Sequence, residues 1–357
     1  MRTFKESDMI DTYNIISQGL YKVPIKISDP ENHYTFFQKV LFGGAPIATT
    51  DDFIAINLER YGSKLTEEAI KGADPNRVNH GTAFDEHYIF PAYYFNEETL
   101  NFSNAKNRVS MNEPMDEPWP MTKRLQYLAA KKRNSMVADL ETTVEKLCSD
   151  VLFTGQYTTR SHKEQKFPIK AANLAIDGSK MVTDPYAVLK EAFKILSKTG
   201  GKPINLILSI DDSSNLCSSE KWLAMLDNRR VNRNIINFRP MDDNGLSYVG
   251  TINVLGFGDL NIYSYAGVYT DKNNTEYNYI PQGKALLVPA RVGLMAYGGL
   301  LTNDGSGFQS VQALKYAYDI YSKTEGALVQ TKIQVQTSPA PIPTAIDKWG
   351  VITGIPA

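Results

Sequence analysis

An uninterrupted stretch between Pro120 and Gly155 constrains the fold more than any other segment, because it contains neither glycine nor proline. Apolar residues recur along it in steps of three or four, with Lys132 filling one gap; they are Leu125, Leu128, Met136, Leu140, Val144, Leu147 and Val151. This spacing places them on one face of a helix. Pro120 suits the first helical position, and Gly155 suits the residue just past the end. The pattern therefore predicts an amphipathic helix, roughly 50 Å long, that lies across a sheet.

Composition excludes several classes of protein. The chain has 357 residues, 42% hydrophobic and 22% charged, which is typical of a folded chain of two or three domains or of one elongated subunit with appendages. Its formal net charge of −1 argues against a dedicated nucleic-acid binder. Cys148 and Cys217 form no CxxC pair, which favours a reducing compartment. The N-terminus is too polar for a signal peptide and no apolar run approaches about 18 residues, so we expect no membrane partner and a cytoplasmic location.

Two segments carry too few apolar residues to fold alone. Residues 1–48 have scattered apolar clusters and few helix caps, which is typical of an extended arm. Residues 49–103 are predicted to be a long β excursion, with a strand around Phe53–Ile56, a return from His87 to Phe95, and a polar segment between them. Strands with so little core cannot be stable in isolation. We expect this excursion to pair with another subunit or to cover an active site as a flap.

Helices and strands alternate from about 184 to 300, which predicts an α/β core. Asp184 is expected to cap a helix that begins at Pro185 and ends at Gly200-Gly201. Strands are predicted at 203–210 and 285–288, and a further pair at 248–255 and 260–269 is joined by a tight turn. A strand pattern returns at 331–353, where prolines confine it to a sheet edge or to a loop.

The sequence contains no constellation typical of catalysis or of metal binding. The four histidines show neither HxH nor HExxH spacing, and the motifs GxxxxGK[ST] and GxSxG are absent. Paired acids such as Asp211-Asp212 are adjacent, so on a strand they would point to opposite faces. We therefore expect no catalytic residue, no metal and no cofactor. The predicted arm (1–48) and β excursion (49–103) have too little apolar surface to fold alone, which indicates assembly with other subunits instead of catalysis.

Two basic clusters are the candidate contact residues. The first half of the predicted long helix has no acid between Glu117 and Asp139, and its basic residues are Lys123, Arg124, Lys131, Lys132 and Arg133. They form either a solvated helix face or a strip that meets a polyanion or an acidic neighbour. The second cluster comprises Arg229, Arg230, Arg233 and Arg239, whose planar guanidinium groups suit contacts between subunits.

Three segments carry a resemblance to a known family. Residues 268–298 (VYTDKNNTEYNYIPQGKALLVPARVGLMAYG) resemble a strand, a polar insert, an IPxGxxLL strand and an RxGxxxYG turn. Residues 336–343 (QTSPAPIP) are similar to a closing segment of that family, and residues 151–158 (VLFTGQYT) to the exit of its long helix. The order and spacing of these segments resemble the lambda-type major capsid protein E family of bacteriophages.

That resemblance implies an α+β capsid fold of the Hong Kong ninety-seven type. Its parts would be an N-arm (1–48), an E-loop β-hairpin (49–103), a P-domain (104–183 and 329–357) with a spine helix at about 120–154 and a β-sheet, and an α/β A-domain (184–328). The four arginines of the second cluster would lie in A-domain contacts. The E-loop would reach a neighbouring subunit through Lys64, Glu67, Glu68, Lys71 and Arg77.

The implied function is that of a major capsid protein, not an enzyme. It would assemble in the host bacterial cytoplasm into hexamers and pentamers of an icosahedral shell, enclosing the double-stranded DNA of a tailed bacteriophage without sequence specificity. A separate scaffolding protein, a portal protein and possible decoration or cement proteins are the implied partners, and the basic strip would face the lumen. The alternatives are an encapsulin-like nanocompartment, a tail or connector component, and a cytoplasmic α/β enzyme with residues 49–103 as a flap.

Overall fold

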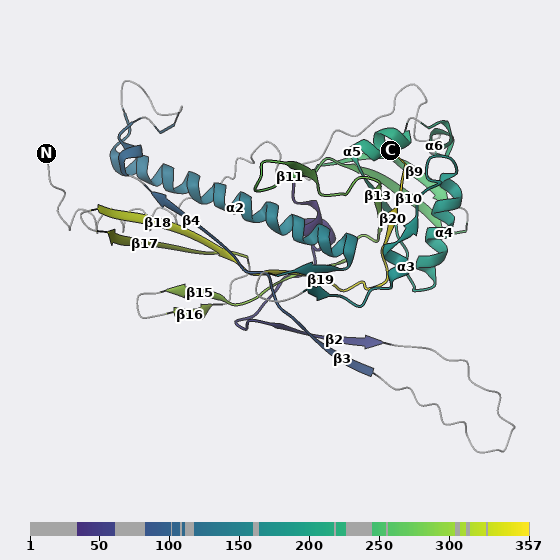
Figure 1. Cartoon of the computed structure of the whole chain (residues 1–357), viewed down its shortest axis with the longest axis horizontal. Coiled ribbons are helices and arrows are strands. Elements are labelled where there is room, and N and C mark those ends of the chain that lie inside the picture. Colours follow the sequence, from purple (N-terminus) through teal and green to yellow (C-terminus); the bar gives the residue numbers. More distant parts are fainter. Residues whose placement is uncertain are drawn as a thin grey trace, which may run out of the picture.

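One long helix, α2 (Met121–Thr154), organises the molecule. The computed structural model describes residues 34–60, 83–100, 102–107, 109–110, 118–159, 164–217, 219–225, 245–254, 256–303, 308–311, 315–325 and 328–356. Figure 1 shows α2 extending from a three-stranded sheet at one end to a six-stranded sheet at the other. The other helices of the described residues are η1 (Phe37–Leu41), η2 (Phe102–Ala105), α3 (Ala171–Leu174), α4 (Pro185–Ser197), α5 (Ile210–Cys217) and α6 (Glu220–Met225).

The ends of α2 follow from its flanking residues. Pro120 has φ −57° and ψ 151°, so it is the N-cap and the helix begins one residue later than predicted. Gly155 adopts a left-handed φ of 71°, and its N–H donates to the carbonyl of Val151 at 2.9 Å. Glycine adopts this conformation without the steric cost that a Cβ would bring. The predicted C-terminal end is confirmed.

The predicted apolar stripe of α2 forms its buried face. Six of the seven stripe residues are buried and Leu128 is half-buried. The N-terminal half of α2 packs on an antiparallel sheet with the order β17 (Ala317–Glu325), β18 (Leu328–Thr337) and β4 (Tyr94–Leu100). Ile333 and Val335 of β18 share one core with Leu125, Met136 and Leu140 of α2. The helix therefore lies across a sheet, as the stripe predicts.

The C-terminal half of α2 packs on a second sheet and on the first described residues. β1 (Ile47–Ala48) pairs in parallel with β14 (Gly293–Tyr297), which pairs antiparallel with β19 (Pro339–Pro343). Phe37 and Phe42, in and beside η1, are buried in the same core as Val144 and Val151. Residues 34–48 of the predicted N-arm thus pack on the chain's own body. Residues 1–33 lie outside the described residues.

The six-stranded sheet carries the predicted α/β core. Its order is β7 (Ile176–Asp177), β20 (Gly350–Thr353), β13 (Lys284–Val288), β8 (Asn205–Ser209), β10 (Gly258–Tyr265) and β9 (Leu246–Val254). The pairs β8–β10 and β7–β20 are parallel and the others are antiparallel. Helix α4 buries Leu189, Phe193 and Leu196 against this core. The Asp184 carboxylate accepts a hydrogen bond from the Ala187 N–H at 3.2 Å, which confirms the predicted cap.

Four two-stranded hairpins complete the described structure. They are β2 (Ile54–Arg60) with β3 (Ala83–Ile89), β5 (Gln156–Thr158) with β6 (Glu164–Lys166), β11 (Val268–Thr270) with β12 (Glu276–Asn278), and β15 (Leu300–Asn303) with β16 (Phe308–Val311). In the first hairpin, β2 covers the predicted strand from Ile54 on, and β3 covers only His87–Ile89 of the predicted return, because Tyr94 already begins β4 of another sheet. Figure 1 shows this hairpin leading away from the body. Among the described residues, no helix is both long and apolar enough to cross a bilayer.

Strand pairing crosses the domain divisions expected from the sequence. β20 and β7 belong to segments grouped with the spine helix, yet both complete the six-stranded sheet. β14 and β17 belong to the segment grouped as the A-domain, yet they pair in the two sheets that pack on α2. Pairing thus joins strands from different predicted domains, and the boundaries of those domains stay predictions.

Candidate assembly surfaces and the buried acids of the spine helix

Two groups of predicted contact residues lie outside the described residues. These are the E-loop residues Lys64, Glu67, Glu68, Lys71 and Arg77, and the four arginines of the α/β block, Arg229, Arg230, Arg233 and Arg239. Their roles therefore stay predictions. The basic strip of α2 can be placed in full.

The five basic residues of that strip do not share one face. Lys131 is exposed, Lys132 forms an ion pair with Glu98 of β4, and the Arg133 side chain is buried. The Arg133 guanidinium lies 4.7 Å from the centre of the Tyr318 ring. Consecutive helical residues are turned by about 100°, so these three neighbours must point in different directions. The prediction of one outward strip is therefore wrong for Arg133.

The two basic residues at the start of α2, Lys123 and Arg124, make different contacts. Arg124 donates to the carbonyls of Ala105 and Lys106 at 3.3 and 2.9 Å, which ties α2 to η2. Lys123 remains exposed, and its Nζ lies 4.3 Å from the centre of the Trp119 ring. We define the exposed stripe as the exposed residues at four-residue spacing on α2, which are Lys123, Tyr127 and Lys131. The half-buried Trp119 precedes them at the same spacing, and its ring meets that of Tyr127. Of the five basic residues predicted to face outward, Lys123 and Lys131 therefore lie on the exposed stripe, where they can contact another molecule.

Two pairs of exposed aromatic residues lie where β2 begins and where β3 is followed by β4. Phe53 and Tyr88 meet edge to face with ring centres 5.3 Å apart, and the exposed fractions of their side chains are 41% and 52%. Tyr93 and Phe95 stack at 6.5 Å and are 51% and 43% exposed. Paired exposed aromatic rings are typical of surfaces that become buried on association. This surface continues directly into β2 and β3.

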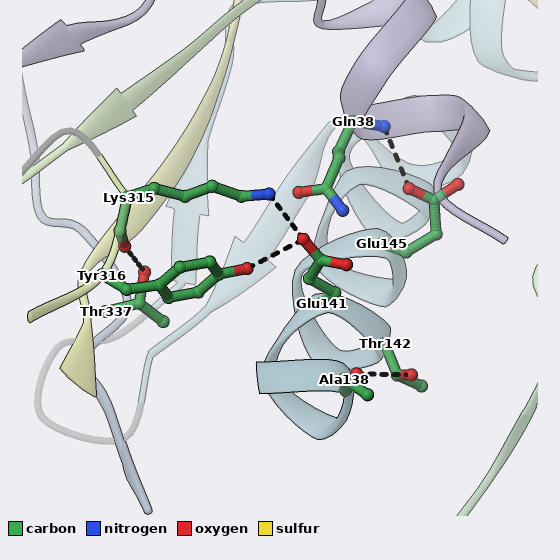
Figure 2. A network of polar contacts seen from close by, with 8 residues as sticks. All are labelled: Gln38, Ala138, Glu141, Thr142, Glu145, Lys315, Tyr316 and Thr337. Carbon is green, nitrogen blue, oxygen red and sulfur yellow. Dashed lines mark hydrogen bonds and ion pairs between the residues drawn. The ribbon is translucent and has the colours of Figure 1, made fainter. Parts of the chain in front are cut away.

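Figure 2 shows Glu141 and Glu145 on successive turns of α2, and both residues are buried. The Glu141 carboxylate accepts from Lys315 Nζ at 2.6 Å and from the Tyr316 hydroxyl at 3.2 Å. Glu145 is 0% exposed and accepts backbone hydrogen bonds from Phe37 and Gln38 of η1. Sequence reasoning missed both acids. The available signal was their four-residue spacing directly beside the apolar stripe at Leu140 and Val144.

One groove of the described residues can be compared with the enzyme alternative. A groove of about 240 Å³ lies along α2 and β5, and its charged side chains are Lys146 and Asp150, which form an ion pair with each other. No three His, Cys, Asp or Glu side chains of the described ranges lie close enough together to hold a metal ion. The β2–β3 hairpin, predicted in one alternative to be a flap, leads away from the body in Figure 1.

Comparison with known proteins identifies the family. The model of the family described as phage major capsid protein E matches residues 47–349, which is most of the chain. The chain belongs to this family. It is therefore a capsid shell protein, located in the virion, with a structural role and the capacity to assemble with copies of itself. Sequence comparison with curated proteins found no relative.

One solved structure is similar enough to this chain to show the fold, and two others are less similar. A protein assigned as a prophage capsid protein in E. coli CFT073 has a TM-score of 0.58 at 15% identity, with 99% of each chain covered. The mature capsid of bacteriophage PhiM1 has a TM-score of 0.49 at 9% identity, covering 93% of this chain and 92% of that one. The SrpI encapsulin of Synechococcus elongatus has a TM-score of 0.47 at 10% identity, covering 96% and 95%. The predicted Hong Kong ninety-seven-like fold is confirmed.

Proposed function

We propose that this capsid protein forms the hexamers and pentamers of an icosahedral shell that encloses the double-stranded DNA of a tailed bacteriophage. The observation that supports this proposal best is the family match over residues 47–349, combined with a hairpin that projects from the body. A β2–β3 strand pair has little core of its own, so it gains stability from contacts outside its own subunit. Assembly would take place in the host bacterial cytoplasm.

Contacts between subunits would be numerous and individually modest. The projecting hairpin would bring Lys64, Glu67, Glu68, Lys71 and Arg77 to a neighbour, and Arg229, Arg230, Arg233 and Arg239 would meet other copies around each capsomer. The exposed aromatic pairs Phe53–Tyr88 and Tyr93–Phe95 would supply apolar area at the same interface. These residues are 41–52% exposed, so each could still bury roughly half of the 150–250 Å² that an aromatic side chain buries in full. At about 25 cal/mol per Å² that is roughly 2–3 kcal/mol each, which exceeds the at most about 1 kcal/mol of a surface ion pair.

Other components would complete the particle. A separate scaffolding protein would direct assembly, a portal protein would occupy one vertex, and a decoration or cement protein could bind near the projecting hairpin. DNA would be held without sequence specificity. A net charge of −1 suits a wall that confines DNA without gripping it tightly. These partners follow from the family resemblance.

Deletion of Ser63–Gly81 tests the role of the hairpin. The deletion leaves Tyr61, Gly62 and Thr82 to join β2 to β3, and loops of three residues with a glycine close hairpins readily. We expect a folded subunit with unchanged thermal unfolding but no closed shells in negative-stain electron micrographs of the purified product. Normal shells from this deletion would overturn the assembly role. In wild-type particles, an interior holding protein instead of DNA would favour the encapsulin alternative.

The exposed stripe of α2 tests the proposal that this surface faces the lumen. We expect Lys123→Gln with Lys131→Gln to lower the temperature at which filled particles release their DNA while the yield of empty shells stays unchanged, because two phosphate contacts per subunit are lost. Lys190→Gln with Lys194→Gln is the control, since these two lysines also lie on one exposed helix face. Equal effects of the two pairs on DNA retention would refute a specific role for the stripe.

A further inference from the structure

Glu145 joins three separate parts of the chain at one buried carboxylate. Its Oε1 accepts hydrogen bonds from the Phe37 N–H at 2.6 Å and from the Tyr265 hydroxyl at 3.0 Å. Its Oε2 accepts from the Gln38 N–H at 3.0 Å. The spine helix is thus tied to η1 on one side and to β10 on the other. All three hydrogen bonds are buried, and the aromatic rings of Phe37, Tyr265 and Tyr279 surround the group.

Among the residues that the structure describes, the carboxylate has hydrogen-bond donors but no cation in contact. One helical turn earlier, Glu141 has Lys315 at 2.6 Å, whereas no salt bridge joins Glu145 to any Lys or Arg of the described residues. Lys39 of η1 acts on it only from a distance and is itself exposed. Burying a charge without a partner is unfavourable, and the neutral acid avoids most of that cost. Burial therefore favours the protonated form, whereas the three hydrogen-bond donors favour the charged form.

The titratable groups that face Glu145 stay protonated. They are Tyr265 on β10, Tyr279 before β13, and Cys148 on α2; burial raises the pKa of each, and the charge of Glu145 raises it further. Burial also raises the pKa of Glu145 itself to about 7, although the N–H groups of Gln38 and Phe37, the Tyr265 hydroxyl and Lys39 all act to lower it. Glu145 is thus the group here that changes charge near neutral pH.

We propose that Glu145 is a proton-coupled latch that holds residues 36–38 on the spine helix and loosens when it ionises. When it is protonated, the acid O–H can donate to the Tyr265 hydroxyl oxygen, which turns from donor to acceptor, while both backbone N–H groups keep their acceptors. When it is ionised, all three hydrogen bonds persist, but the buried charge opposes docking. The latch is a property of the folded subunit and does not depend on the proposed shell.

The sign of the pH effect follows from linkage. An undocked, hydrated Glu145 has a pKa near the ordinary value of 4.5, and the docked group has one near 7. Docking therefore takes up a proton between these pH values. Docking is strongest below about pH 4.5 and weakens as pH rises through about 7, by at most about tenfold per pH unit. Across pH 5 to 8 the docking constant should fall by roughly tenfold to a hundredfold.

Hydrogen exchange of the full-length, unassembled chain tests the latch. Exchange of a peptide spanning 34–42, corrected for intrinsic rates, is measured by mass spectrometry from pH 5 to 8. In the wild type we expect protection at Phe37 and Gln38 to fall as pH rises. Glu145→Gln should abolish this dependence, whereas Glu141→Gln, the buried acid one turn away, should retain it. pH-independent protection in the wild type, or unchanged dependence in Glu145→Gln, would overturn the proposal.

Tyr265→Phe supplies a second readout in case Glu145→Gln undocks the segment at every pH. This variant keeps the ring and the acid but removes one hydrogen bond that lowers the pKa of Glu145. The midpoint of the pH dependence should therefore move to higher pH. An unmoved midpoint would mean that the dependence does not originate at Glu145, and the latch would be refuted.

Discussion

Substitution of Gly155 by alanine separates backbone strain from packing at the end of the spine helix. Gly155 has φ 71°, and an added Cβ would lie 3.0 Å from Ile169 Cδ1 and 3.1 Å from Leu174 Cδ1. The left-handed conformation costs a non-glycine residue roughly 1–2 kcal/mol. Displacing two packed methyl groups by a few tenths of an ångström adds about 1 kcal/mol, the low end of overpacking costs, because both are ends of flexible side chains. We expect Gly155→Ala to cost about 2–3 kcal/mol.

Gly200→Ala is the matched control. Gly200 follows helix α4 with φ 76°, so its strain is nearly the same, but no atom lies within 4 Å of an added Cβ. It should cost only about 1–2 kcal/mol. Urea denaturation of the unassembled subunit, followed by tryptophan fluorescence, gives both free energies of unfolding if the slope m stays constant. Equal midpoints for the two variants would refute the packing of Ile169 and Leu174 on the helix end.

Three further substitutions or reactions test single contacts. Asp184→Ala should lower the thermal stability of the subunit by about 1 kcal/mol, because the cap of α4 is lost, while Asp184→Asn should retain most of it; equal losses would contradict the capping role. Trp349→Phe removes the buried hydrogen bond from Nε1 to the Leu152 carbonyl, 3.1 Å long, and should cost about 1–3 kcal/mol in urea denaturation. Cys148 is fully buried and burial raises the pKa of its thiol, so peptide mass spectrometry should find it alkylated only after unfolding; labelling in the folded chain would argue against this burial.

Much of the architecture could be predicted because its signals are local. Periodicity predicted α2 and its buried face, and glycine conformation predicted its end at Gly155. Asp184 before Pro185 predicted the start of α4. Short apolar and alternating runs predicted β2, part of β3 and five strands of the six-stranded sheet, but not β7. Each of these features depends on neighbours within a few residues along the chain, so a sequence displays it directly.

Partners distant along the chain could not be predicted in the same way. Arg133 lies in an unbroken basic run, but only the placement of Tyr318 on β17 shows that its side chain is buried. Residues 34–48 have the composition of an arm, yet their phenylalanines fit between α2 and β10. The strands β7 and β20 complete a sheet whose other members lie between them in the sequence.

The amino-acid sequence by itself determined the long helix, its caps, the strand segments and, through its motifs, the capsid family. Only the tertiary structure decided what Glu145 does, because its three hydrogen-bond donors come from residues 37, 38 and 265. Helical periodicity predicts which face of the helix a residue such as Glu145 occupies. It does not predict what packs on that face, and the free energy of a buried carboxylate depends on those neighbours.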